Sequence, residues 1–269
     1  MVTAGIDIGA KTVKVVLAEA GRVLGKSLVL AGLDSAAATE RAFDQALTAA
    51  GLKRDQVGRL MATGTGRKGC HLTAAQITEV GAAARGMTHL LPSCRTVIDV
   101  GAEEGRTVRC DGQGKVIDFA FNEKCAAGAG AFAEGMARAL EVPLEELGPL
   151  ALKSQQAVPM NAQCAVFAES EVVTLIHNKT PRADIARAVL DAIASRIISM
   201  VRKVGFEKDV ALIGGVALNP GFVAAMQRGL ELELHVPADP EYVGALGAAL
   251  AAADAGPTAG RSSGQEAQA

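Results

Sequence analysis

The sequence predicts an α/β protein of two duplicated halves with a cleft between them, and two observations support this class. A group of short strands rich in β-branched residues opens the chain and returns at residue 96. Residues 6–10, Ile-Asp-Ile-Gly-Ala, match residues 98–102, Ile-Asp-Val-Gly-Ala, at an offset of 92 positions. We expect halves at residues 1–94 and 95–253, with the last helix free to pack back on the first half, and a disordered tail at 254–269.

The first half opens with three strands and continues with two helices. The strands are expected at residues 3–8, 12–18 and 22–30. Asp34 or Ser35 caps an alanine-rich helix, and Gly51 ends it. A further strand at residues 60–62 enters the loop Thr63-Gly64-Thr65-Gly66, and we expect the next helix to begin near Thr73.

The second half repeats the three strands and is then mostly helical. The strands are expected at residues 96–100, 106–110 and 115–121, and a fourth at 209–213. Helices are expected at residues 126–140, 165–177 and 242–253. Between them, Thr180 caps a long helix with Pro181 at its first position, and Gly205 ends it. Asn219 and Pro220 begin another helix.

Composition excludes several classes of function. The chain carries 27 Lys and Arg against 29 Asp and Glu, which is not the basic balance of a nucleic-acid-binding protein. Its longest apolar stretch, residues 245–253, is far short of the ~20 residues that span a bilayer. Charged Asp7 and Lys11 interrupt the apolar start that an export signal needs. Five cysteines without a close pair fit a reducing compartment, so we expect a cytoplasmic protein that binds neither nucleic acid nor membrane.

Each duplicated hairpin carries an Asp-x-Gly turn, at Asp7 and Gly9 and again at Asp99 and Gly101. Glycine after a strand lets backbone N–H groups approach a phosphate, and the aspartate can hold Mg²⁺ beside the phosphates. One such motif alone is more simply an ordinary tight turn. Two of them facing each other across a cleft would hold a triphosphate.

A late glycine pair, Gly214 and Gly215, follows the fourth strand of the second half and precedes Asn219. Two glycines at a strand end allow close contact with a base or a ribose, although a plain strand-to-helix turn is the alternative. The sequence has neither a Walker A motif nor a Gly-x-Gly-x-x-Gly after its first strand, which disfavours a P-loop ATPase and a Rossmann dehydrogenase.

Together, the duplicated halves, the paired aspartate hairpins and the late glycine pair resemble the actin/hexokinase/Hsp70 superfamily of ATPases. The resemblance covers about residues 1–253 and implies two actin-like (ribonuclease H-like) halves with a nucleotide cleft between them. The superfamily includes sugar kinases, chaperones and filament proteins, so other residues must narrow the function.

Cys125 and Cys164 each directly precede a predicted helix. A helix N-terminus stabilises negative charge and therefore favours a thiolate or an anionic cluster. Two thiolates are half the ligands of a [4Fe–4S] cluster, and a two-fold dimer would supply the other half. Spacing alone leaves two buried structural cysteines as an alternative, because they lie 39 positions apart and neither belongs to a Cys-x-x-Cys pair.

The residues around these cysteines resemble one family. Residues 122–128, Asn-Glu-Lys-Cys-Ala-Ala-Gly, and 164–171, Cys-Ala-Val-Phe-Ala-Glu-Ser-Glu, are similar to motifs of the activators of 2-hydroxyacyl-CoA dehydratases and the ATPase subunits of benzoyl-CoA reductases. The resemblance implies that Cys125 and Cys164 ligate a [4Fe–4S] cluster shared by two protomers. It also implies that ATP hydrolysis changes the angle between two helices beside the cluster and so drives electrons to a partner.

Within this family, two segments favour a reductase subunit. Residues 102–106, Ala-Glu-Glu-Gly-Arg, and 129–132, Ala-Gly-Ala-Phe, depart from the activator pattern and look more like the small ATPase subunits of benzoyl-CoA reductase. We therefore expect an ATPase that passes electrons from a ferredoxin-like donor to acyl-CoA-reducing partner subunits, paired with an identical or a paralogous ATPase protomer. The alternatives are a homodimeric activator of a 2-hydroxyacyl-CoA dehydratase, a small-molecule kinase of the same fold, and a filament or chaperone-like module.

Each site residue has an expected role. Asp7 and Asp99 are expected to organise Mg²⁺ and the phosphates of ATP, and Glu103 is a candidate to orient or deprotonate the attacking water because it follows the second hairpin turn. The expected nucleotide contacts are Gly9, Lys11, Thr12, Gly101, Ala102, Gly214, Gly215 and Asn219.

Overall fold

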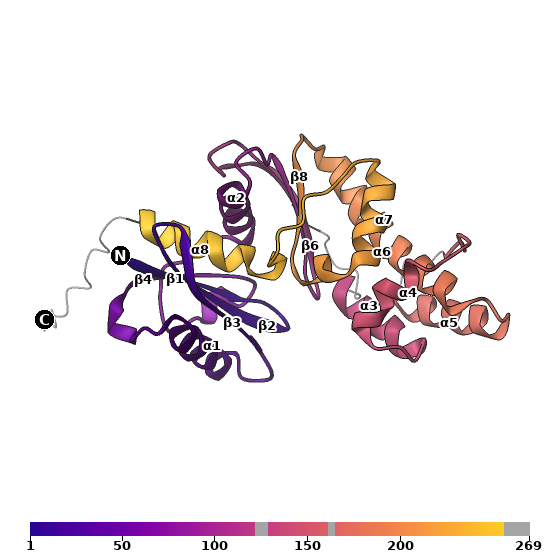
Figure 1. Ribbon diagram of the computed structural model, residues 1–269, viewed down its shortest axis with the longest axis horizontal. Helices are drawn as coiled ribbons and strands as arrows, with labels where there is room; N and C mark the ends of the chain where they lie inside the picture. Colours follow the sequence, from indigo (N-terminus) through magenta and orange to yellow (C-terminus); the bar gives the residue numbers. More distant parts are fainter. Residues whose placement is uncertain (122–128, 161–164, 256–269) are drawn as a thin grey trace, which may run out of the picture.

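The computed structural model describes residues 1–121, 129–160 and 165–255, and two four-stranded sheets organise its two lobes (Figure 1). The first sheet has the order β3-β2-β1-β4 and the second has the order β7-β6-β5-β8. In each sheet the first three strands run antiparallel, and the fourth lies parallel to the first. The strands are β1 (Val2–Ile8), β2 (Thr12–Glu19), β3 (Arg22–Leu30), β4 (Val57–Thr63), β5 (Thr96–Val100), β6 (Gly105–Cys110), β7 (Val116–Phe121) and β8 (Val210–Ile213). The repeated order and directions confirm the duplicated α/β architecture.

Each sheet carries an equivalent helix after its third strand. Helix α1 (Ser35–Ala50) packs on β2 and β3, and the long α6 (Arg182–Val204) packs on β6 and β7. The side chain of Asp34 accepts a hydrogen bond from the Ala37 N–H at 2.9 Å, so Asp34 is the cap of α1. Gly51, with a φ of 66°, ends the helix as predicted.

The opposite faces of the sheets are covered by helices from distant parts of the chain. Helix α8 (Val243–Asp254) packs on β1, β2 and β4, whereas α2 (Glu79–Leu90) packs on β5, β6 and β7 (Figure 1). The two helices also pack on each other, so closely that a Cβ at Gly247 would lie 1.8 Å from the carbonyl oxygen of Ala82. This α2–α8 pair therefore joins the two sheets.

Three helices lie between β7 and α6 and have no counterpart in the described part of the first half. They are α3 (Ala129–Ala139), α4 (Leu144–Ala151) and α5 (Ala165–His177), and with α6 and α7 (Pro220–Leu230) they form the far end of the molecule (Figure 1). The largest apolar core lies here and buries Phe132 and Phe222. Helix α4 was not predicted, since Pro143 gives its start no side-chain cap and Pro149 lies inside it.

Two helix starts differ from the sequence prediction. Helix α2 begins at Glu79, capped by the Thr78 hydroxyl, and not near Thr73. The preceding segment instead runs beside β4. The Ala62 N–H donates to the Ala75 carbonyl at 2.9 Å, and the Ile77 N–H donates to the Ala62 carbonyl at 3.0 Å. Helix α6 begins one residue later than predicted, with Pro181 itself at the cap position.

Two predictions reach beyond the described residues. The helix predicted at 126–140 is described from Ala129 onward, and the tail predicted at 254–269 is described only to residue 255, with Asp254 still in α8. Within the described ranges, every helix is too short or too polar to cross a lipid bilayer.

Candidate functional site

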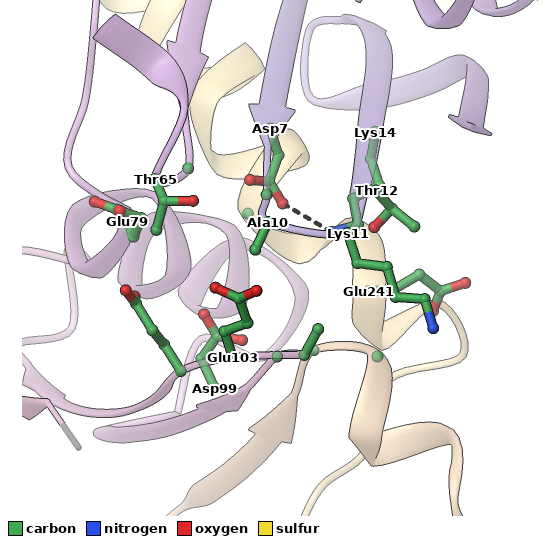
Figure 2. A pocket seen from close by; sticks show the side chains of 18 of the residues that line it. Asp7, Ala10, Lys11, Thr12, Lys14, Thr65, Glu79, Asp99, Glu103 and Glu241 are labelled. Carbon is green, nitrogen blue, oxygen red and sulfur yellow. Dashed lines mark hydrogen bonds and ion pairs between the residues drawn. The ribbon is translucent and has the colours of Figure 1, made fainter. Parts of the chain in front are cut away.

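A cleft of about 720 Å³, its open mouth included, lies where the two hairpins meet (Figure 2). Asp7 and Lys11 line it from the β1–β2 hairpin, and Asp99 and Glu103 line it from the β5–β6 hairpin. Figure 2 shows Asp7 and Glu103 pointing from opposite sides into the same space. The structure therefore brings together residues 92 positions apart that the sequence repeat singles out.

The two hairpins have equivalent geometry. The Gly9 N–H donates to the Thr12 carbonyl at 3.0 Å, and the Gly101 N–H donates to the Glu104 carbonyl at 2.9 Å. Each aspartate also faces a cation on the next strand. Lys14 Nζ lies 3.4 Å from a carboxylate oxygen of Asp7, and Arg106 lies 3.2 Å from one of Asp99.

Two glycine loops are equivalent in the same way, one after β4 and one after β8. Gly64 and Gly214 have φ values of +89° and +88°, which residues other than glycine rarely adopt. A Cβ at Gly64 would lie 2.4 Å from the Ile8 carbonyl oxygen, and one at Gly214 would lie 2.4 Å from that of Val100. This equivalence was not predicted from the sequence, although both loops follow the fourth strand of their half.

Acidic groups outnumber basic ones in the cleft. Six carboxylates line it: Asp7, Glu79, Asp99, Glu103, Glu104 and Glu241. The three cations are Lys11, Lys14 and Arg106. Burial raises the pKa of Asp99, and the carboxylate of Asp7 raises it further, while Arg106 opposes both effects. An anionic ligand would therefore need a divalent cation with it.

Arg106 holds the second hairpin in a network that was not predicted from the sequence. Besides Asp99, it contacts Glu104 at 2.5 Å and Glu79, at the start of α2, at 3.7 Å. Glu79 in turn lies 2.7 Å from Arg67, which also donates to the Gly64 carbonyl at 2.9 Å. The network thus joins the glycine loop of the first half to the aspartate of the second.

A second, more apolar recess of about 1230 Å³, including space open to solvent, adjoins the cleft. Its walls come from β3, α3, α4 and the short turn η3 (Gly215–Leu218), with Leu28, Leu144 and Leu218 among them. Lys11 and Gly215 line both spaces, so the recess continues the cleft.

The remaining predicted contacts also lie in these two spaces. Gly9, Thr12, Ala102 and Gly214 line the cleft. Asn219 lines the recess, and its side chain accepts a hydrogen bond from the Phe222 N–H at 3.0 Å as the predicted cap of α7.

Helix α3 contacts both hairpins. The N–H groups of Gly130 and Ala131 donate to the carbonyls of Gly101 and Ala102 at 3.2 and 2.9 Å. From the other hairpin, the Lys11 ammonium forms an ion pair with Glu134. A change in either hairpin can therefore reach this helix directly.

The predicted cluster ligands, Cys125 and Cys164, lie outside the described residues. In the sequence they precede α3 and α5, and these two helices pack on each other. The thiols of Cys94 and Cys110 are buried, and burial raises their pKa values to about 12 and about 11. Those two thiols are packing groups.

The chain belongs to the BadF/BadG/BcrA/BcrD ATPase family, whose model matches residues 4–252. This family has the two-lobed, actin-like ATPase fold that the two sheets display.

Three relatives place it within the family. The chain is 38% identical to the activator of lactoyl-CoA dehydratase of Anaerotignum propionicum over 95% of its length and 98% of the relative's. It is 34% identical to one of the subunits of benzoyl-CoA reductase of Thauera aromatica, over 93% of this chain and 92% of that one. The crystallised activator of 2-hydroxyisocaproyl-CoA dehydratase from Clostridium difficile, with bound ADPNP, superposes with a TM-score of 0.89 at 35% identity, covering 94% of each chain.

Proposed function

We propose that this chain is the ATP-hydrolysing activator of an acyl-CoA dehydratase and works as a dimer that delivers electrons to it. The observation that supports this most is the convergence of two equivalent aspartate hairpins and two equivalent glycine loops on one cleft. A single hairpin of this kind would be an ordinary turn, whereas the paired arrangement suits a bound triphosphate.

The comparisons favour the dehydratase activator over the reductase component that residues 102–106 and 129–132 suggest. The activators match at 38% and 35% identity over nearly the whole chain, and the reductase component matches at 34%. The difference in identity is small, so the proposal keeps the chemistry that both share, an ATPase that works with an acyl-CoA enzyme. The partner enzyme that we propose is an acyl-CoA dehydratase.

In this proposal the triphosphate occupies the cleft and the nucleoside occupies the apolar recess. The ADPNP complex of the related activator supports a nucleotide in this fold. Mg²⁺ would enter with the phosphates, because the described residues offer no ready-made group of three or more His, Cys, Asp or Glu for a metal. Asp7 and Asp99 would hold its water shell, and the surplus of carboxylates in the cleft makes the cation necessary.

The two hairpin tips would have different roles in hydrolysis, one in binding phosphate and the other in activating water. Lys11 is a flexible cation that can reach the phosphates, and Lys11 and Thr12 line both the cleft and the recess. Glu103 is exposed at the tip of the other hairpin and points into the cleft, where it can orient the attacking water or accept its proton (Figure 2).

Helix α3 would transmit a conformational change from the nucleotide cleft to the rest of the second half. Its first turn is hydrogen-bonded to the Gly101-Ala102 turn, and Glu134 in its second turn pairs with Lys11. Phosphate that draws Lys11 away would break this ion pair, and motion of the second hairpin would pull on the first turn of the helix. ATP can shift α3 only to the extent that it binds one arrangement of these contacts better than the other.

Cys125 and Cys164 fit the cluster that the family resemblance implies. They are thiolate donors, half of a four-thiolate set, and in the sequence they precede two helices that pack together. Cys94 and Cys110 are unsuitable because burial keeps both thiols protonated. A [4Fe–4S] cluster held by Cys125, Cys164 and their copies in a second protomer would supply one-electron transfer.

The test is anaerobic purification followed by iron and sulfide analysis, an ATPase assay, and reduction of a dehydratase component. We expect about four iron atoms per dimer and ATP-dependent electron transfer. Cys125→Ser and Cys164→Ser should each lose iron, whereas the matched variant Cys70→Ser should keep it. Wild-type protein free of iron and sulfide, or one that phosphorylates a small-molecule acceptor, would contradict the proposal. Stable co-purification with larger acyl-CoA-reducing subunits would instead favour the reductase component.

A further inference from the structure

Glu241 lies at the junction between the cleft and the recess. It belongs to the short turn η4 (Pro240–Tyr242), and the Pro240 carbonyl accepts a hydrogen bond from the Gly214 N–H at 2.9 Å. The turn is therefore fixed to the second glycine loop. The Glu241 side chain lines both spaces, beside Lys11 and Thr12 (Figure 2).

One carboxylate oxygen of Glu241, Oε2, is buried and accepts no hydrogen bond within the described part of the chain. The neighbouring cations are engaged elsewhere, Lys14 with Asp7 and Lys11 with Glu134. Buried polar atoms in proteins are nearly always hydrogen-bonded, so an unpartnered acceptor on a side chain that lines a binding space calls for a donor on the ligand.

The position of the Glu241 side chain, between the cleft and the recess, selects the chemistry of that donor. A phosphate group offers acceptor oxygens and negative charge, which a carboxylate does not bind without a cation. The leucines of the recess suit a flat base. Between phosphates and base, a nucleotide presents the sugar hydroxyls, which are neutral donors.

We propose that Glu241 binds a ribose hydroxyl of the nucleotide and makes the site selective for ribonucleotides over deoxyribonucleotides. This inference rests on the proposed function, since it assumes that the phosphates lie in the cleft. Glu241 is thus a specificity residue and takes no part in hydrolysis itself.

The test is calorimetric titration with ADP, 2′-deoxy-ADP and 3′-deoxy-ADP, which avoids turnover. A hydrogen bond to a charged group implies that wild type binds ADP about ten- to a hundredfold more tightly than at least one deoxy analogue. Glu241→Ala should weaken ADP binding by the same factor and leave binding of that analogue unchanged. Glu241→Gln, which keeps the size and one acceptor, should lie between them.

Asp239→Ala is the matched control. It removes an exposed carboxylate two residues before Glu241 in the chain, and that carboxylate pairs with Lys26 and lines neither space. Its preference for ADP should equal that of wild type. A wild type without preference, or a Glu241→Ala variant that keeps the wild-type preference, would overturn the inference and leave the proposed function intact. Failure of wild type to bind any of the three nucleotides would overturn both.

Discussion

The two hairpins share a backbone and differ in charge. Residues 7–14 read Asp-Ile-Gly-Ala-Lys-Thr-Val-Lys, and residues 99–106 read Asp-Val-Gly-Ala-Glu-Glu-Gly-Arg. The aspartate, the glycine and the alanine are the same, and the same turn hydrogen bond closes both hairpins. The tip carries Lys11 in one and Glu103 in the other. The two halves have therefore kept the same hairpin geometry, while the side chains at the tip have opposite charge.

The cations behind the two aspartates also differ. Lys14 offers a single ammonium group at 3.4 Å from Asp7, whereas the planar guanidinium of Arg106 contacts Asp99, Glu104 and Glu79. The first aspartate is held by one flexible contact and the second by a network that extends to α2. The second hairpin is thus held by more ion pairs than the first, and it is also the one whose backbone carbonyls hold the first turn of α3.

The largest expected effect tests what the hairpins have in common. Asp7→Asn and Asp99→Asn should each lower Mg²⁺-dependent ATP hydrolysis by about 10²–10³-fold, because each removes a charge that holds the Mg²⁺ beside the transferring phosphoryl group. Steady-state phosphate release at saturating Mg²⁺ measures this loss. The unfolding free energy of Asp99→Asn should equal or exceed that of wild type, since burial raises the pKa of Asp99 and its charge therefore costs stability. Full activity in either variant would break the equivalence of the two halves.

The second prediction concerns their difference. Arg106 is about 10% exposed, so Arg106→Ala should lower the unfolding free energy by about 3–5 kcal/mol, because three carboxylates are left facing one another. Lys14→Ala leaves only Asp7 without its cation and should cost about 1–2 kcal/mol. Urea unfolding followed by circular dichroism gives both values.

A double variant provides the control for this difference. Asp99→Asn combined with Arg106→Ala should recover part of the stability lost in Arg106→Ala, since one of the three carboxylates is then neutral. Equal losses in Arg106→Ala and Lys14→Ala, with no recovery in the double variant, would mean that the two hairpins are held in the same way.

Local patterns in the sequence predicted the elements that local chemistry determines. The strand pattern and the Asp-x-Gly repeat predicted both sheets, and the caps at Asp34 and Asn219 gave correct helix starts. The predicted start of α2 was wrong because residues 75–77 pair with Ala62 of β4 through backbone hydrogen bonds, a long-range pairing that propensity does not reveal. The crossing of α2 and α8 between the sheets likewise depends on packing of small residues far apart in the chain.

Sequence motifs indicated part of the candidate site, whereas residues that only the fold brings to the cleft were not expected. Asp7 and Asp99 were expected there because the repeat aligns them, and Glu103 because it follows the second hairpin turn; all three line the cleft. Glu241 and Glu79 lie outside any motif, and only the fold brings them to the cleft. Aligning the two loops that follow the fourth strands would have paired Gly64 with Gly214 from the sequence alone.

The last prediction separates the two hairpin tips by their kinetics. Lys11→Met removes a cation that can hold phosphate, so we expect about tenfold weaker nucleotide binding and a smaller change in kcat. Glu103→Gln removes a group that can take up the proton of the attacking water, so kcat should fall by about 10²-fold with little change in nucleotide affinity. ATPase kinetics together with ADP titrations separate these effects. If both variants changed only affinity, Glu103 would have no role in hydrolysis, and the opposite charges at the two tips would serve binding alone.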